Sequence, residues 1–217
     1  MADALAPRKE DALIVVDLQN DFVRGGALAV PEGETILPLA NRLIGAFAQV
    51  VVTQDWHPPG HASFASSHPG AKPFDVIAMP YGQQVLWPDH CVQGSHGAAL
   101  VDGLAVDPAF LILRKGIHAA VDSYSAFLEA DRQTTTGLGA LLQARGVERV
   151  FVAGLATDFC VAFSAVDARA AGFETYVVED ACRAIDADGS LDAAWARMDS
   201  AGVRRIASSA LLGRTRA

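Results

Sequence analysis

Short apolar runs alternate along the chain with segments whose apolar residues recur every three or four positions. The runs have the length and the β-branched content of buried strands, and the segments between them have the spacing of amphipathic helices. The predicted strands cover residues 12–16, 50–55, 110–114, 150–154, 174–178 and 203–206. This alternation predicts an α/β fold, a doubly wound and mainly parallel six-stranded sheet with helices on both faces.

The connecting helices are predicted from apolar spacing and from the residues at their ends. They cover residues 35–47, about 138–146, 157–172 and 190–202. At the start of the third helix we expect Thr157 or Asp158 to cap the first turn with its side chain, and Ser190 can do the same for the fourth. Gly172 suits the left-handed conformation that often closes a helix.

One long segment, residues 56–109, is rich in proline, glycine and histidine and has no sustained periodicity. A loop of this length inside a compact domain is usually functional, unless elements in it have been missed. All six histidines lie between His57 and His118. We therefore treat residues 56–109 as a candidate metal and substrate region. It would belong to a single domain, residues 1–217, that begins with an N-terminal extension of residues 1–10.

Composition narrows the class of partner. The net charge of −8 argues against nucleic acid and against anionic membranes, because both require a positive surface. The apolar run 12–16 is too short for a signal peptide or a membrane span, so we expect a cytoplasmic protein that acts on a small molecule. A homo-oligomer stays open. The cysteines, Cys91, Cys160 and Cys182, are odd in number and irregularly spaced, which predicts free thiols.

Four polar residues stand at or just beyond the carboxyl ends of predicted strands: Asp17, Asp55, Lys115 and Cys160. In an open parallel sheet the ligand crevice lies at this edge. Cys160 would occupy the first turn of a helix, where the amides and the dipole favour a thiolate. Asp17 can take its proton if burial raises the carboxyl pKa, and Lys115 would favour the thiolate. Taken alone, Asp17, Lys115 and Cys160 each fit a structural role better than a catalytic one, but their convergence favours catalysis.

A second group suits a metal. Alternate side chains of an extended segment point the same way, so Asp55 and His57 can bind one ion. His90, further along the loop region, can reach the same ion, and His61 is an additional candidate ligand. A carboxylate with two imidazoles suits one divalent ion, Zn, Fe or Mn, with positions left for water or substrate.

Six motifs, in order along nearly the whole chain, resemble the nicotinamidase (pyrazinamidase) branch of the isochorismatase-like cysteine hydrolases. They are 16–22 (VDLQNDF), 54–61 (QDWHPPGH), 87–91 (WPDHC), 115–116 (KG), 122–127 (DSYSAF) and 154–160 (GLATDFC). The resemblance implies an amidohydrolase of NAD salvage that converts nicotinamide to nicotinate and ammonia through a cysteine thioester. Pyrazinamide would be a second pyridine-like carboxamide substrate.

The resemblance also implies roles for individual residues. The catalytic triad of the family matches Asp17, Lys115 and Cys160. Its metal ligands match Asp55, His57 and His90. Its ring-binding residues match Phe22, Trp87 and Tyr124, and we expect Leu155 to contribute to the same pocket. The family has a cis peptide before the residue that matches Ala156, which turns that amide, together with the amide of Cys160, toward an oxyanion.

Two other interpretations stay open. On the same scaffold, the enzyme could hydrolyse isochorismate or a carbamoyl amide, although those relatives do not generally carry the cluster of Asp55, His57 and His90. From a different class, the chain could be a non-catalytic binding protein. The intact set of Asp17, Lys115 and Cys160 speaks against that second alternative.

Overall fold

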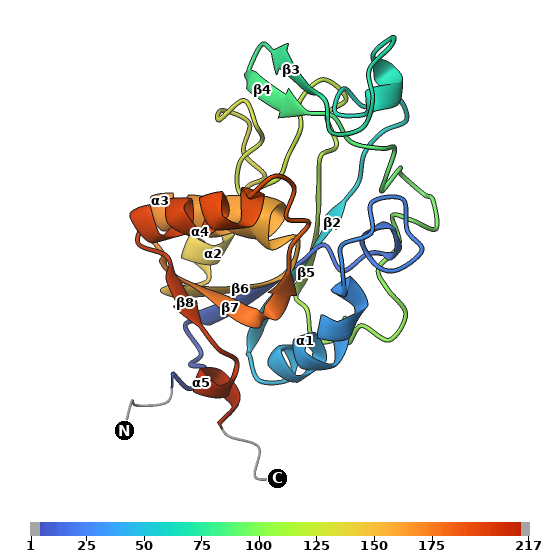
Figure 1. Ribbon diagram of the computed structural model, residues 1–217. Helices are drawn as coiled ribbons and strands as arrows, with labels where there is room; N and C mark the ends of the chain where they lie inside the picture. The colour runs from blue at the N-terminus through green and yellow to red at the C-terminus, as the bar shows by residue number, and fades with distance from the viewer. Residues whose placement is uncertain (1–4, 214–217) are drawn as a thin grey trace.

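A computed structural model describes residues 5–213, whose main sheet has six strands in the order β5–β2–β1–β6–β7–β8 (Figure 1). The strands are β1 (Asp11–Val16), β2 (Gln49–Asp55), β5 (Leu111–Lys115), β6 (Arg149–Leu155), β7 (Glu174–Arg183) and β8 (Arg204–Ile206). Each strand of this sheet is parallel to its neighbours. The carboxyl ends of all six strands therefore lie at one edge, and the predicted fold class is confirmed.

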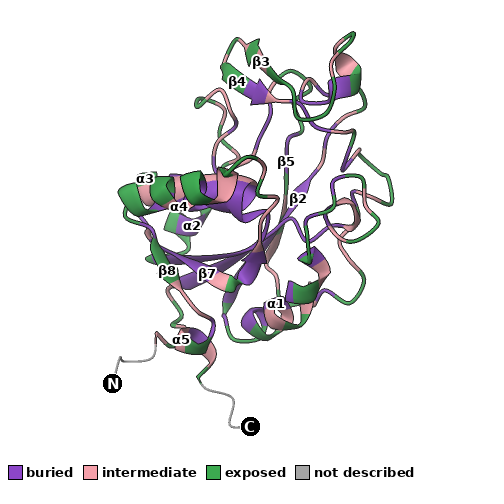
Figure 2. Ribbon diagram, in the orientation of Figure 1, coloured by how far each residue is buried: buried purple, intermediate pink, exposed green. Residues whose placement is uncertain are grey.

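Helices cover both faces of the sheet (Figure 1). The covering helices are α1 (Leu37–Ile44) and α5 (Ser209–Leu212) on one face, and α2 (Leu138–Ala144), α3 (Ala162–Ala170) and α4 (Ser190–Ser200) on the other. The central strand shows why the sequence produces these layers. Leu13 packs with residues of α1, whereas its neighbour Ile14 packs with residues of α2, α3 and α4. Both faces of β1 are buried (Figure 2), which explains its continuous apolar run.

Several element bounds differ from the predictions. The predicted helix 35–47 begins as a tight turn at Gly33–Ile36 and ends at Ile44, so Phe47 lies in the following loop. Strand β7 continues past Val178, because its pairing with β6 resumes after an irregular stretch at Gly154 and Cys182. The polar residues of that stretch interrupt the apolar pattern, so the second half of the strand could not be predicted from the sequence. Helix α5 was not predicted.

The region 56–109 is not one continuous loop, which corrects the prediction. It contains an antiparallel hairpin of β3 (Val76–Met79) and β4 (Gly82–Val85) and a short turn of helix at Ala65–Ser67. The hairpin strands have only four residues each: β3 is a short apolar run, VIAM, and β4 is mostly polar, so neither shows the apolar alternation by which half-buried strands are predicted. In Figure 1 the hairpin stands beyond the carboxyl ends of β2 and β5, so this region overhangs the edge where a ligand is expected.

The predicted N-terminal extension lies against the base of the domain where it is described. Residues 1–4 lie outside the described residues. Leu5 packs against the core, and the side-chain amide of Gln49 donates to the carbonyl of Lys9 over 2.8 Å. Between residues 5 and 213, no helix has the length and apolar character needed to span a bilayer.

Candidate active site

The structure brings the four strand-end residues together around the Lys115 ammonium. Its Nζ lies 2.9 Å from Oδ2 of Asp17 and 3.3 Å from Sγ of Cys160, and it forms a second ion pair with Asp55. A further hydrogen bond, of 3.0 Å, runs to the carbonyl of Ser123. All of these side chains are buried. One buried cation at the end of β5 therefore links two acids and one thiol that lie at or just beyond the ends of three other strands, β1, β2 and β6.

Cys160 follows β6 through an unusual connection. The Leu155–Ala156 peptide is cis, and Thr157–Val161 forms a π-helical turn before α3 begins at Ala162. The predicted side-chain cap at Thr157 or Asp158 is wrong, because neither side chain caps the turn. Asp158 instead binds a segment far along the chain. The predicted cap at Ser190 is also absent: Gly189 holds that position, and Ser190 donates its hydroxyl to Asp158.

Burial governs the charge state of the thiol. It raises the pKa of Cys160 well above its usual value, and the Lys115 ammonium, which acts in the opposite direction, does not outweigh it. The carboxylates of Asp17 and Asp55 raise the pKa further. The sequence-based expectation of a thiolate favoured by the helix terminus is therefore wrong for the free protein. A protonated sulfur needs a base before it can act as a nucleophile.

Asp17 has the properties of that base. Burial raises the pKa of its carboxyl group, the Lys115 charge opposes this effect, and the charge of Asp55 adds to it. The hydroxyl of Thr53 donates to Oδ1 of Asp17 over 2.5 Å and orients the carboxylate. Burial disfavours the charge of Lys115, but Asp17 and Asp55 outweigh burial and raise its pKa well above the usual value. Lys115 therefore stays charged, and Asp17 holds a proton more tightly than an ordinary aspartate.

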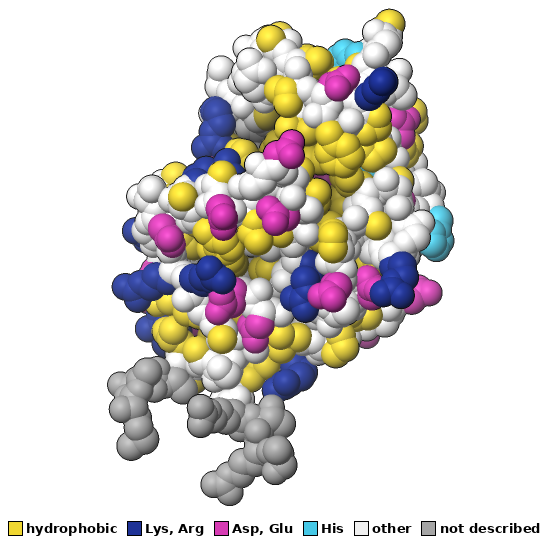
Figure 3. All heavy atoms as spheres, viewed as in Figure 1, with side chains coloured by type: hydrophobic (Ala, Val, Ile, Leu, Met, Phe, Trp, Pro, Cys, Tyr) yellow, Lys and Arg dark blue, Asp and Glu magenta, His cyan; other side chains and the backbone are white. Residues whose placement is uncertain are grey.

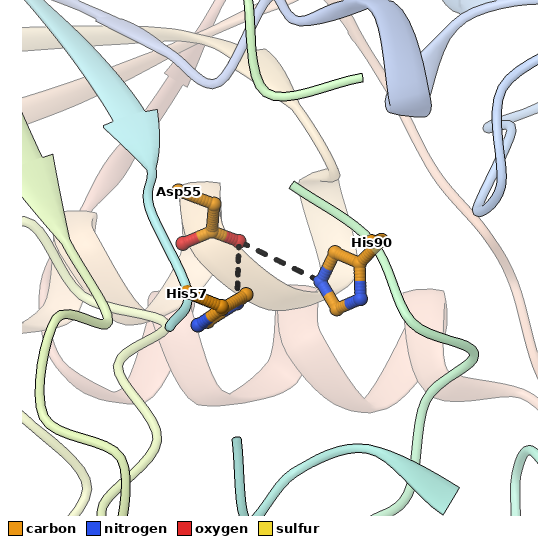
Figure 4. Close-up of side chains that lie close together, drawn as sticks. All are labelled: Asp55, His57 and His90. Atoms are coloured by element: carbon orange, nitrogen blue, oxygen red, sulfur yellow. Dashed lines mark ion pairs between the residues drawn. The ribbon is translucent and has the colours of Figure 1, made fainter. Parts of the chain in front are cut away.

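Beside this cluster, Asp55, His57 and His90 converge (Figure 4). Oδ2 of Asp55 lies 3.6 Å from Nε2 of His57 and 3.9 Å from Nε2 of His90. The other ring nitrogens lie within hydrogen-bond distance of backbone carbonyls: Nδ1 of His57 is 3.0 Å from Gly116 O, and Nδ1 of His90 is 2.8 Å from Pro88 O. A proton on each Nδ1 leaves Nε2 as a lone-pair donor. The three donor atoms therefore fit one divalent ion.

His61 does not join this group. Its Nδ1 lies 2.7 Å from the hydroxyl of Ser63, and its Nε2 lies 3.0 Å from the carbonyl of His118. Both ring nitrogens are thus engaged elsewhere, although the ring centroid lies 4.3 Å from that of His57, with the two planes tilted by 36°. The position of His61 favours a role in supporting His57.

A cavity opens between the two groups. Its walls include Cys160, Ala156 and the residues Asp55, His57 and His90. The ring-binding candidates Phe22, Trp87 and Tyr124 line it as well. Indole Nε1 of Trp87 donates to the Tyr124 hydroxyl over 3.0 Å, which fixes one aromatic wall. The outer surface beneath the β3–β4 hairpin is also rich in hydrophobic side chains (Figure 3). The site therefore combines a flat apolar slot with one polar end.

Comparison with known proteins agrees with this geometry. Residues 11–210 match the model of the isochorismatase domain. Over 201 residues the chain is 55% identical to a nicotinamidase of Acinetobacter baylyi, covering 93% of this chain and 94% of the relative. The chain belongs to the isochorismatase family, in its nicotinamidase branch.

Two solved structures of the family extend the comparison. An L. infantum protein in complex with nicotinate superposes with a TM-score of 0.84 at 40% identity, covering 96% of this chain and 98% of the other. The pyrazinamidase of Pyrococcus horikoshii in complex with zinc gives a TM-score of 0.73 at 37% identity, covering 91% and 99%. The family likeness therefore extends over the whole fold and includes proteins solved with a pyridine ligand or a metal.

The sequence did not single out every residue at this family site. Phe159 lines the cavity with its ring 4.8 Å from that of Trp87, in an edge-on contact, and Asp122 accepts a hydrogen bond of 2.6 Å from Gln84. Both stand inside motifs that the sequence does show. Leu28 and Ile185 also line the cavity, but they lie in loops without any periodic signal.

Leu155 is the one predicted substrate-binding residue that the cavity does not include. Its side chain is fully buried in the core, where it points toward Gly33. Only its peptide bond to Ala156 approaches the site. A side-chain contact between Leu155 and a substrate therefore does not follow from its position.

Proposed function

We propose that this protein hydrolyses nicotinamide to nicotinate and ammonia, and pyrazinamide in the same way, as an enzyme of NAD salvage. The observation that carries the proposal is the cavity shared by two groups. Cys160, which contacts Lys115 beside Asp17, lines this cavity together with Asp55, His57 and His90. A planar heteroaromatic carboxamide matches this combination, because its ring fits an aromatic slot and its amide carbon is an electrophile. The nicotinamidase relatives support the same conclusion.

The first half of the reaction transfers the acyl group to sulfur. The Asp17 carboxylate takes the proton of the Cys160 thiol while Sγ bonds to the carboxamide carbon. The raised pKa of Asp17 assists this step, because it brings the proton affinity of the carboxylate closer to that of the sulfur. The backbone amides of Ala156 and Cys160 stabilise the tetrahedral oxyanion, with a contribution of about 3 kcal/mol for each donor. Lys115 stays protonated and holds both reacting side chains.

The second half releases the products. The C–N bond breaks, Asp17 returns its proton to the departing nitrogen, and ammonia leaves. A thioester between Cys160 and the acyl group remains. Asp17 then accepts a proton from a water molecule that attacks the thioester carbon. Nicotinate departs, and the thiol is restored when Asp17 gives the proton back to sulfur.

Asp55, His57 and His90 would hold one divalent ion, and Zn, Fe and Mn all suit a set of one carboxylate and two imidazoles. When bound, the ion supplies a Lewis acid that fixes the pyridine nitrogen, directly or through water, and so orients the ring. The protein's own contribution is to orient the two imidazoles through the carbonyls of Gly116 and Pro88. Phe22 and Trp87 then bind the faces of the ring.

The direct test is to incubate the purified protein with nicotinamide and to follow ammonia and nicotinate, with the metal content measured on the same sample. We expect both products in equal amounts. Isochorismate and a carbamoyl amide serve as comparison substrates, because relatives on this scaffold act on them. Metal-loaded protein that releases no ammonia from nicotinamide, but turns over a comparison substrate, would overturn the proposal.

A further inference from the structure

Asp158 lies next to the nucleophile's neighbour Phe159, yet its carboxylate is directed away from the reacting groups. It is buried and accepts three hydrogen bonds from one distant segment. The backbone amides of Ile185 and Asp186 donate over 3.1 and 2.8 Å, and the hydroxyl of Ser190 donates over 2.6 Å. One side chain of the nucleophile's turn thus binds the connection between β7 and α4.

This connection forms part of the substrate cavity. It runs from Arg183, where β7 ends, to Ser190, where α4 begins, and its residue Ile185 lines the cavity. Two non-glycine residues in it, Asp186 and Asp188, have positive φ angles of 54° and 51°. Such a backbone is uncommon for residues other than glycine, although aspartate adopts it more readily than most, and contacts with the rest of the fold help to hold it. The carboxylate of Asp158 provides three such contacts.

Ile185 is half-buried, so it forms an edge of the cavity between its interior and the surface. Phe159, which also lines the cavity, belongs to the same turn as Asp158. The turn that carries Cys160 and the wall residue Ile185 are therefore joined through one carboxylate. Loss of that carboxylate would remove the hydrogen bonds that hold the backbone of Ile185 and Asp186.

We propose that Asp158 is a positioning residue that holds Ile185 against the substrate cavity, and that Ile185 limits which ring-substituted pyridine carboxamides are accepted. The inference rests on the proposed function and deepens it, because it names the part of the cavity that sets substrate specificity. Loss of the Asp158 or the Ile185 side chain should allow the protein to accept more of these ring-substituted substrates. The effect should appear in KM and in discrimination between substrates, because within residues 5–213 neither side chain forms a hydrogen bond or an ion pair with Asp17, Lys115 or the Cys160 sulfur.

The test compares nicotinamide with its 2-, 4-, 5- and 6-methyl derivatives in Ile185→Ala and Asp158→Ala. In Ile185→Ala, we expect kcat/KM for at least one methyl derivative, relative to nicotinamide, to rise about tenfold. In Asp158→Ala, the same derivative should gain, KM for nicotinamide should rise about tenfold, and kcat should change less than threefold. Adding Ile185→Ala to Asp158→Ala should change the relative kcat/KM of the methyl derivatives little further, because both substitutions act on the same wall of the cavity.

Asp180→Ala is the matched control. The Asp180 carboxylate also binds a backbone amide and a hydroxyl, both of Ser208, over 2.8 and 2.6 Å, but at the start of α5 and away from the cavity. This variant should leave KM and discrimination unchanged. If Asp158→Ala fails to fold, Ser190→Ala, which removes only the hydroxyl donor, should give the same change on a smaller scale.

Amide hydrogen exchange at Ile185 and Asp186 separates this inference from the proposed function, because it needs no turnover. Exchange should be faster in Asp158→Ala than in wild type or in Asp180→Ala. An inactive wild-type protein would overturn the proposed function. An active wild type whose Asp158→Ala variant keeps its discrimination, or loses kcat with KM unchanged, would overturn the role of Asp158.

Discussion

The strand ends and the loop region 56–109 each supply part of the site, but they hold their side chains by different means. At the strand ends the register of the sheet fixes the positions: Val16 pairs with Gly154, and Asp55 pairs with Lys115. In the loop region, individual hydrogen bonds fix the positions of the side chains. His90, for example, is oriented by one carbonyl. The cluster around Lys115 is thus a property of the fold, whereas the ring and metal contacts depend on individual hydrogen bonds.

This difference predicts how each part fails. A substitution at a strand end should leave the site assembled but remove a chemical function. A substitution that touches the loop contacts should leave the chemistry intact but displace the metal or the ring. Asp21 illustrates the second kind, since its carboxylate accepts a hydrogen bond of 2.7 Å from the amide of Cys91, the residue after His90. Single substitutions can separate loss of a chemical function from displacement of the metal or the ring.

The largest effect is expected for Cys160→Ala. The variant should fold and bind nicotinamide but lose turnover by roughly 10⁴-fold or more, because no other group can form the thioester. Cys182→Ala is the matched control: this thiol is also buried and free, but it lies in β7 away from the cavity. Ammonia release measures the effect. A Cys182→Ala variant as inactive as Cys160→Ala would mean that burial, not nucleophilicity, explains the loss.

Asp17→Asn should have the next largest effect. The amide keeps the shape of the carboxylate but cannot accept the thiol proton, so kcat should fall by about 10²- to 10⁴-fold. Binding of nicotinamide, measured by calorimetry on the inactive protein, should change little. A variant that binds nicotinamide much more weakly and keeps its kcat would contradict the assignment of Asp17 as the base.

Gly116→Ala tests the loop side of the comparison. Gly116 has a φ of +65°, and a methyl group there would collide with the imidazole of His57. We expect metal affinity to fall by roughly 10- to 100-fold, because the substitution disturbs an orienting contact of a ligand. Gly146→Ala is the control, since its φ of +71° is similar and its Cβ would meet nothing. Equal metal content in the two variants, measured after dialysis, would disprove the expectation.

The pH dependence of thiol alkylation should show the most gradual effect, about tenfold per pH unit. Burial raises the pKa of Cys160 well above its usual value, so the reactive thiolate of the free protein is scarce at neutral pH and increases as pH rises. The rate of inactivation by iodoacetamide should therefore climb steadily from pH 6 to pH 9. Cys182, whose pKa burial raises to about 12, should remain unmodified in peptide maps. A rate that is constant above pH 7 would indicate a thiolate already formed.

The sequence predicted the fold and the strand-end chemistry for the same physical reason. Parallel strands buried on both faces must be continuously apolar, so a charged residue after such a run marks the edge of the sheet. Asp17, Asp55 and Lys115 are visible in this way. The hairpin of β3 and β4 is not, because each of its strands has only four residues, too few for an apolar run or an alternation to distinguish the strand from a loop.

The loop-borne part of the site could be predicted only where a motif carried it. His90 and Trp87 stand in a recognisable motif, whereas Ile185 lies between two elements in a backbone held by tertiary hydrogen bonds. The charge state of Cys160 also could not be predicted from its neighbours in the sequence. The helix terminus favours a thiolate, but burial among residues of four strands decides the pKa, and sequence spacing does not report burial.

The thioester on Cys160 is the most direct test of the whole account. Wild-type protein should be mixed with nicotinamide, quenched with acid during turnover and digested for mass spectrometry. We predict a nicotinoyl group on the peptide that contains Cys160 and none on the peptides of Cys91 or Cys182. Full turnover with no adduct at Cys160, together with wild-type ammonia release by Cys160→Ala, would contradict the account.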